Sequence, residues 1–446
     1  MLPLIRRFLL ALLVAAGVAS VAAQSPAPCA PVGTPTCDPN GNPVPDNPAP
    51  NPGPGNPAPG NPAPGEPSPE PSSTVTVVDA VKSTVTLGGG KAVTGAQGIA
   101  LDSSTGLVYI GLNGSIISGC EGDASISGGT PGPGANQMSI VDPAASREIA
   151  AVPTGMSPIW PTVDRKRGVV YMMGSGGAGT VTVHNASNGS TITTITVGGR
   201  PHQGGLDNTS GLMIVGNTVR SSNAVAEQNH ATVVNTNTDT ISREFETSPA
   251  PHGVAVDQER HLAYFSAVGD GAIVALNSEN GQVLFSDVPK KAYGTAFGGN
   301  NMLTRHAATR RLFQVNTQPG ATGLIVVDEV TLAAEKVISF GATSPIPWGM
   351  WVDEPNRLLF AALPNSNTVG VVDLDTLTHV VNVPVGACPY AVTVDPERRI
   401  GVTSNQGTPA QNASASIFDL CPVYRATGRI VNGCPAVASS PFSWQH

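Results

Sequence analysis

The stretch PHGVAVDQERHLAYFS, residues 251–266, decides the fold because its pattern recurs along the chain. It reads as a short apolar strand ending in an aspartate, a tight turn, and a second apolar strand. Five related stretches repeat this pattern, and the acids at the equivalent position are Asp102, Asp164, Asp207, Asp257, Asp353 and Asp395. A seventh stretch, residues 301–315, has the same spacing of apolar residues but lacks the aspartate. His306 or Ala307 falls near the position that the aspartate has in the other stretches.

A second pattern alternates with the first. Short apolar runs end in Asp or Asn, such as SIVD (139–142) and IVVD (325–328), and another apolar run follows each. Each repeat therefore predicts four strands joined by tight turns. Repeats of about 40–50 residues with four strands are typical of propeller blades. We predict an all-β, seven-bladed β-propeller of four-stranded blades over residues 73–434.

The runs TVVD (76–79) and STVTL (83–87) precede the first full repeat. Because an unpaired blade edge invites aggregation, we expect part of residues 74–87 to pair with the last blade and close the ring. How this segment shares that blade with SIFD (416–419) and GRIV (428–431) stays open.

The chain before the repeats has a different composition. Arg6 and Arg7, the apolar run 8–21 and the small residues of VAAQS predict a signal peptide over residues 1–23. Residues 24–72 are rich in Pro, Asn and Gly and predict a disordered linker, either a tether or a plain spacer. Residues 435–446 form a predicted C-terminal tail. We expect an exported protein, periplasmic or associated with the cell surface.

The six cysteines suit disulfides in an exported chain. In the predicted ring, Cys120 and Cys388 fall on the same face of neighbouring blades 1 and 7, so a bond between them would staple the closure. Cys421 and Cys434 flank the last predicted strand pair and are expected to bridge each other. Cys29 and Cys37 could close a small loop before the linker.

The charge pattern limits the partners. The formal net charge is −8, and loss of Arg6 and Arg7 would lower it to −10. Clusters of Lys and Arg that would follow phosphates are not visible, so nucleic acid and anionic lipid surfaces are unexpected partners. We expect a monomer that does not insert into a membrane after signal cleavage, with a small molecule or a protein as its partner.

The repeats resemble YVTN-type β-propeller repeats. The second strand reads VYIGLN (108–113), LFQVN (312–316) and GVTSN (401–405), and the third strand and its turn read VVDLDTLTHVV (371–381). The resemblance covers about residues 74–431 and implies the seven-bladed fold. It does not imply one function, because this architecture carries surface-layer, binding and enzymatic roles. Lactonases and antibiotic lyases are more distantly similar, and no catalytic motif of theirs can be transferred.

The candidate site follows from the position five residues before each aspartate. The first strand of each blade lines the central channel, so these residues should meet at one mouth: Gln97, Ile159, His202, His252, Trp348 and Tyr390, with Trp160 adjacent. Blade 5 contributes Tyr293 by one alignment and Met302 by another. The connection between the second and third strands of blade 3 should add Arg220, Glu227 and His230 on the same face.

Three interpretations of this mouth stay open besides simple hydration by polar residues. The first is a binding or interaction module, which we prefer because no phosphate loop, nucleophile elbow or calcium loop is present. The second is a lactonase- or lyase-like enzyme that uses His202, His252, His230 and Glu227. The third is a divalent-metal site on the same side chains; no cofactor is otherwise predicted. The repeated aspartates should be turn residues, and His184, His261 and His379 should be solvated.

Overall fold

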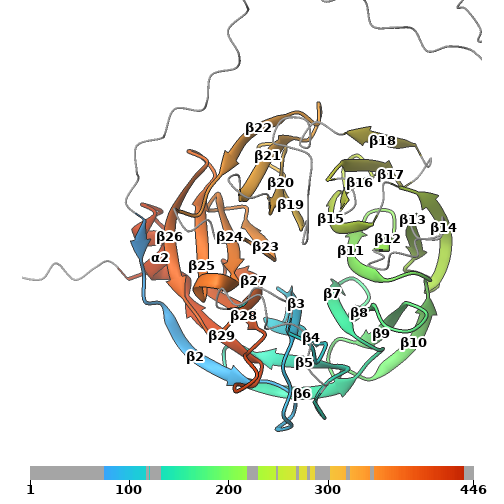
Figure 1. Ribbon diagram of the computed structural model, residues 1–446, viewed down its shortest axis with the longest axis horizontal. Helices are drawn as coiled ribbons and strands as arrows, with labels where there is room; N and C mark the ends of the chain where they lie inside the picture. The colour runs from blue at the N-terminus through green and yellow to red at the C-terminus, as the bar shows by residue number, and fades with distance from the viewer. Residues whose placement is uncertain are drawn as a thin grey trace, which may run out of the picture. The chain divides into compact units, whose positions relative to one another are not determined.

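The computed structural model describes residues 75–116, 120, 132–217, 230–247, 250–267, 271–278, 282–286, 302–317, 322–341 and 346–435. In this part of the chain the strands form seven sheets arranged around a central axis (Figure 1). The chain is therefore a seven-bladed β-propeller, as the repeats predicted. The predicted signal peptide, the linker and the Cys29–Cys37 pair lie outside the described residues.

Each of the first five blades is an antiparallel sheet of four strands in chain order, from the axis outward. Blade 1 holds β3 (Ala96–Asp102), β4 (Leu107–Leu112), β5 (Gln137–Asp142) and β6 (Arg147–Pro153). Blade 2 holds β7 (Pro158–Asp164), β8 (Val169–Gly174), β9 (Thr180–Asn185) and β10 (Thr191–Thr196). Blade 3 holds β11 (Pro201–Asp207), β12 (Leu212–Asn217), β13 (His230–Asn235) and β14 (Thr240–Glu246). Blade 4 holds β15 (Pro251–Asp257), β16 (Leu262–Ala267), β17 (Ile273–Asn277) and β18 (Val283–Ser286), and blade 5 holds β19 (Leu303–His306), β20 (Arg311–Asn316), β21 (Gly323–Asp328) and β22 (Ala334–Ile338).

The last two blades close the ring with strands from the start of the propeller. Blade 6 holds β23 (Met350–Asp353), β24 (Leu358–Leu363), β25 (Thr368–Asp373) and β26 (Thr378–Pro384), and β1 (Thr76–Val77) adds to its outer edge in parallel. Blade 7 holds β27 (Pro389–Asp395), β28 (Ile400–Asn405) and β29 (Ser414–Asp419), and β2 (Val81–Thr86) is its antiparallel outer strand. The predicted closure by residues 74–87 is confirmed, and it uses two blades.

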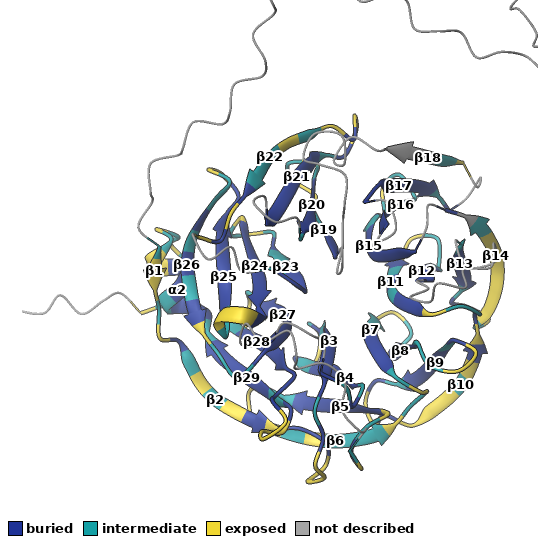
Figure 2. Ribbon diagram, viewed as in Figure 1, coloured by how far each residue is buried: buried dark blue, intermediate teal, exposed yellow. Residues whose placement is uncertain are grey.

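Burial increases toward the middle of each blade (Figure 2). The second strands are almost wholly buried, as β8 and β24 show, whereas the outermost strands β6 and β10 alternate between exposed and covered positions. A strand packed between two neighbours within its blade and two adjacent blades is covered on both faces, so it can be apolar throughout. The core is therefore a ring of packed blades.

The repeated aspartates are turn residues. In blade 4, the Oδ1 atom of Asp257 accepts hydrogen bonds from the backbone N–H groups of Glu259 and Arg260, at 3.0 and 3.3 Å. Four residues after each acid the backbone has a positive φ, at Gly106, Gly168, Gly211, His261, Arg357 and Arg399. Arg310 takes the same conformation, which places His306 rather than Ala307 at the missing acid in blade 5. His306 Nδ1 contacts the Thr309 hydroxyl at 2.7 Å, so the imidazole replaces the carboxylate in the turn.

Two predicted disulfides are confirmed. Cys120–Cys388 joins blades 1 and 7 across 268 residues of chain, and Cys421–Cys434 closes a short loop. The prediction that Cys421 and Cys434 flank a strand pair is wrong, because α2 (Leu420–Ala426) follows β29 directly. The Asp419 side chain caps this helix by accepting the N–H of Cys421, which ends the strand there. Two disulfides agree with an oxidising compartment outside the cytoplasm.

The prediction that His184 and His379 are solvated is also wrong. Both are buried: His184 contacts Gly189 O and the Thr182 hydroxyl, and His379 contacts Val381 O and Asn382. His184 lies on β9, the third strand of blade 2, and His379 lies on β26, where its ring packs against Phe340 with centroids 4.9 Å apart. His261 remains partly exposed and lies 2.6 Å from Asp207 of the preceding blade.

Within the described residues, no helix is long and apolar enough to cross a membrane.

Candidate functional site

The candidate site begins where the innermost strands start. In blades 1, 2, 3, 4 and 7 the pairing of the first two strands shifts register near this point, as between Pro201 and Gly204 and between Pro251 and Val254. Such bulges redirect side chains and are common beside functional sites. His202 and His252 lie inside these two shifts, so their rings leave the regular alternation of the strand.

Five predicted residues from five blades come together at this mouth. The rings of His202 and His252 stack with centroids 3.4 Å apart, and the Tyr390 hydroxyl lies 3.5 Å from His202 Nε2. Trp348 packs edge-on against Tyr390 at 4.9 Å, and Trp160 lies 6.4 Å from the same ring. All five are buried. The result is a cluster of aromatic and imidazole rings with polar atoms at Tyr390 and the histidines.

Glycines beside the cluster let the inner strands approach closely. The Gly349 N–H donates to the carbonyl of Tyr390 at 2.8 Å, and a Cβ on Gly349 would lie 2.4 Å from that of Ala391. A Cβ on Gly98 would likewise meet the Ile159 carbonyl and the Trp160 ring at 2.5 Å. A side chain at either position would push neighbouring blades apart. The recurring glycine after the mouth residue therefore allows rings from different blades to meet.

The remaining predicted residues do not join the cluster in the described part of the chain. Gln97 is buried, and its carbonyl accepts a hydrogen bond from Ser404 of blade 7. His230 begins β13 and lies 3.8 Å from Glu244 on the neighbouring strand of its own blade. Met302 is buried in the main core, one residue after the position equivalent to His252. Arg220, Glu227 and Tyr293 lie outside the described residues.

The predicted divalent-metal site finds no support among the residues that the structure describes. No group of three or more His, Cys, Asp or Glu side chains there could hold an ion. His202 and His252 face each other with stacked rings, Tyr390 lies beside His202, and Trp348 packs against Tyr390. The cluster is a set of buried aromatic and imidazole rings, tilted against one another by 30–77°, that also carries hydrogen-bonding atoms.

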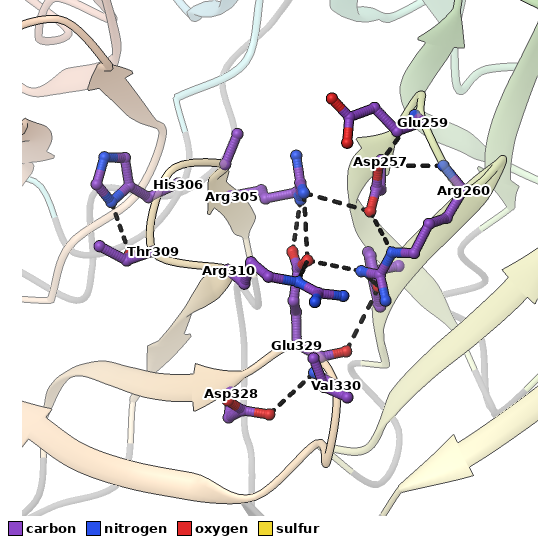
Figure 3. A network of polar contacts seen from close by, with 12 residues as sticks. Asp257, Glu259, Arg260, Arg305, His306, Thr309, Arg310, Asp328, Glu329 and Val330 are labelled. Atoms are coloured by element: carbon purple, nitrogen blue, oxygen red, sulfur yellow. Dashed lines mark hydrogen bonds and ion pairs between the residues drawn. The ribbon is translucent and has the colours of Figure 1, made fainter.

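One polar group was not anticipated from the sequence. On the face that carries the turns between first and second strands, Arg260, Arg305 and Arg310 surround the buried Glu329 (Figure 3). The signal that could have revealed it is the blade 5 repeat itself. There the turn acid is missing and Arg305 replaces the aliphatic residue that precedes the acid elsewhere.

Comparisons with known proteins agree on the fold alone. Neither a protein-family model nor a curated protein matches the chain. Among solved structures, a chain of hydrazine synthase from Kuenenia stuttgartiensis is similar, with a TM-score of 0.54 and 13% identity. The match covers 73% of this chain and 96% of that one. At this identity the likeness supports the propeller architecture and carries no activity across.

Proposed function

We propose that the protein is a binding module whose channel mouth recognises a ligand or partner group through aromatic and imidazole contacts. The observation that carries this proposal is the meeting of His202, His252, Trp348 and Tyr390 from four blades. These positions vary from blade to blade, whereas the strand after them keeps the Gly-Val-Ala-Val-Asp rhythm. In a repeat fold, variation confined to one face of each repeat is where binding specificity is placed.

The chemistry of the cluster favours a flat, partly polar group. Aromatic rings supply contact area at a low cost in side-chain entropy, and the Tyr390 hydroxyl and imidazole nitrogens can orient a ligand by hydrogen bonds. An aromatic or heteroaromatic ring satisfies both requirements. A catalytic role would also need a nucleophile or a general base aimed at a substrate, and the described contacts at the mouth support binding better.

Fragment binding tests this proposal. A panel of aromatic and heteroaromatic fragments is screened by ligand-detected NMR against the wild type, Trp348→Leu and Trp351→Leu. Trp351 is the matched control, because it lies three residues further along the chain, on β23, and packs against a different apolar cluster. We expect Trp348→Leu to weaken mouth-binding fragments about fivefold, and Trp351→Leu to leave them unchanged.

Two results would contradict the proposal. Equal loss in both tryptophan variants would show that the fragments bind elsewhere or that the fold has changed. A fragment converted to product during the measurement, and spared in His202→Ala, would favour the enzymatic alternative.

A further inference from the structure

We propose that the arginine cluster of blades 4 and 5 is a binding site for a small anion with carboxylate or phosphate oxygens. The site is a cavity of about 670 Å³ lined by residues of two neighbouring turns, among them Arg260, Arg305 and Arg310. These turns join the first and second strands, at the ends of β15 and β19 away from the mouth. The site is thus separate from the proposed ring-binding mouth.

Two buried carboxylates hold the three guanidinium groups together. Arg305 donates Nε–H to Glu329 at 2.5 Å and its Nη2 lies 3.3 Å from Asp257. Arg260 donates to Asp257 at 2.5 Å and to Glu329 at 2.6 Å, and Arg310 donates to Glu329 at 3.1 Å. Figure 3 shows the three arginines converging on Glu329 from different sides. Three cations and two carboxylates thus form the hydrogen-bonded network, with Glu259 in the cavity lining and Asp328 near Arg310 as further carboxylates.

The accessible part of this network is positive. The side chains of Glu329 and Asp257 are 0% and 3% exposed, whereas Arg310 is 52% exposed. The carboxylates of Asp257 and Glu329 contact the Nε atom of each of the three arginines. They also contact the Nη2 atoms of Arg260 and Arg305. Arg260 Nη2 also donates to the Tyr264 hydroxyl at 2.8 Å. Among the residues that the structure describes, Nη1 of Arg260, Nη1 of Arg305 and both Nη atoms of Arg310 have no hydrogen bond or ion pair. Guanidinium groups offer paired donors that match carboxylate and phosphate oxygens.

The repeat shows that packing does not require a charge at the positions of Arg305 and Glu329. The position of Arg305 is aliphatic in the other six blades, where it is Leu101, Val163, Leu206, Val256, Val352 and Val394. The position of Glu329, just after the third strand, carries Pro143, Ala186, Thr236, Ser278, Leu374 and Leu420 elsewhere. In the six other blades, uncharged residues therefore pack at both of these positions. Replacing buried ion pairs by apolar residues is often neutral or stabilising, so a charged solution in one blade indicates a task beyond stability.

The surroundings select a small anion. The formal net charge of the whole chain is −8, which disfavours a large polyanion over the whole surface. Glu259 also lines the cavity and is exposed at its edge. A ligand must therefore reach the guanidinium groups past one carboxylate, which a compact anion can do.

Calorimetric titration of the full chain at low ionic strength tests the site, with inorganic phosphate and succinate as separate probes. The key variant is Arg310→Gln, and Arg357→Gln is its matched control. Arg357 takes the same turn position in blade 6, with similar exposure (50%) and φ (55° against 53°), and pairs with Asp375. Loss of Arg310 should weaken binding about tenfold or more, while Arg357→Gln should change it less than about twofold.

Glu259→Gln is a second variant, and it should strengthen anion binding because it removes the carboxylate at the cavity edge. Misfolding could weaken binding but could not strengthen it. Binding of phosphate alone would assign the site to phosphoryl compounds, and binding of succinate alone would assign it to carboxylates. The proposal is overturned if neither probe binds the wild type. It is equally overturned if Arg310→Gln and Arg357→Gln lose the same affinity, because that result would reflect overall charge.

Discussion

The turn carboxylate of blade 3, Asp207, makes several contacts at once. Asp207 Oδ1 accepts the N–H and hydroxyl of Thr209 at 3.0 and 2.6 Å, and its Oδ2 lies 2.6 Å from His261 Nδ1 of the next blade. Burial alone would raise the pKa of Asp207, but the hydrogen bonds from Thr209 and His261 outweigh it and lower the pKa below 3.8. The charged form is therefore the one that the fold stabilises.

Asp207→Asn should lower the free energy of unfolding by about 1–3 kcal/mol at pH 7. Because the folded pKa is lowered, the stabilisation is present above pH 3.8 and is lost as the pH falls through the folded value. The difference between wild type and variant should therefore shrink in strong acid. Urea unfolding at pH 7 and pH 3 measures it, and a constant difference across this range would contradict the assignment.

His184 should affect the free energy of unfolding at a higher pH than Asp207 does. Burial lowers its pKa from 6.5, with the hydrogen bond to Gly189 acting in the opposite direction. A base with a lowered folded pKa contributes stability above pH 6.5, which is lost as the pH falls through the folded value. His184→Gln should therefore reduce the loss of stability between pH 7 and pH 5. The same urea titration measures this, and an unchanged slope would show that folding does not lower the pKa of His184.

At the scale of elements, the ring is closed by strand β2 and by the Cys120–Cys388 bond. In the chain-entropy description, a cross-link stabilises more when it closes a longer loop. The two disulfides span 268 and 13 residues, so they form a natural comparison. All four cysteines lie outside the strands, so removing either disulfide leaves the backbone hydrogen bonds between the strands of each sheet in place.

Cys120→Ala/Cys388→Ala should therefore cost about 5 kcal/mol of unfolding free energy, against about 3 kcal/mol for Cys421→Ala/Cys434→Ala. Denaturant unfolding of both double variants gives the two values. The reverse order would mean that the short loop, which holds α2 against the blade, contributes more through native contacts than the closure contributes through entropy.

For the whole molecule, the start of the propeller can be located by truncation. A chain that begins at Ser73 retains β1 and β2 and should keep the unfolding temperature of the longer protein. A chain that begins at Gly88 loses β2 together with the buried Val85 and Leu87, which should cost at least about 4 kcal/mol. Calorimetry compares them, and equal unfolding temperatures would refute closure by β2.

The propeller was predictable from sequence because each blade repeats the same local signals. A strand, an acid and a turn residue four positions later recur with little change, so blade number and closure followed. The meeting of His202 and His252 also followed from equivalent positions in adjacent blades.

Three features were not predictable, each for a physical reason. The blade 5 repeat marks Arg305 as unusual, but Glu329 contacts Arg305 across strands of its own blade and Arg260 across a blade boundary, and no short-range pattern predicts these pairs. Helix α2 has seven residues and a proline in its first turn, too short to show helical periodicity. His184 looks exposed because it alternates with Val181 and Val183, but both faces of β9 are buried. His379 shares its face with the buried Val381 and Val383, so alternation alone would have placed it inside.

Blade 7 is assembled from the two ends of the propeller, and this sets an order of events during synthesis. Strand β2 is among the first parts of the domain to be made, yet its partner β29 ends at Asp419. Until the ribosome has passed that residue, β2 lacks the strand with which it pairs and can make only its few contacts with blade 1. A second copy that offers its own β29 in this interval could take the strand instead, joining two molecules end to end. Slower translation near the end of the gene would lengthen the interval, and with it the yield of exchanged dimers.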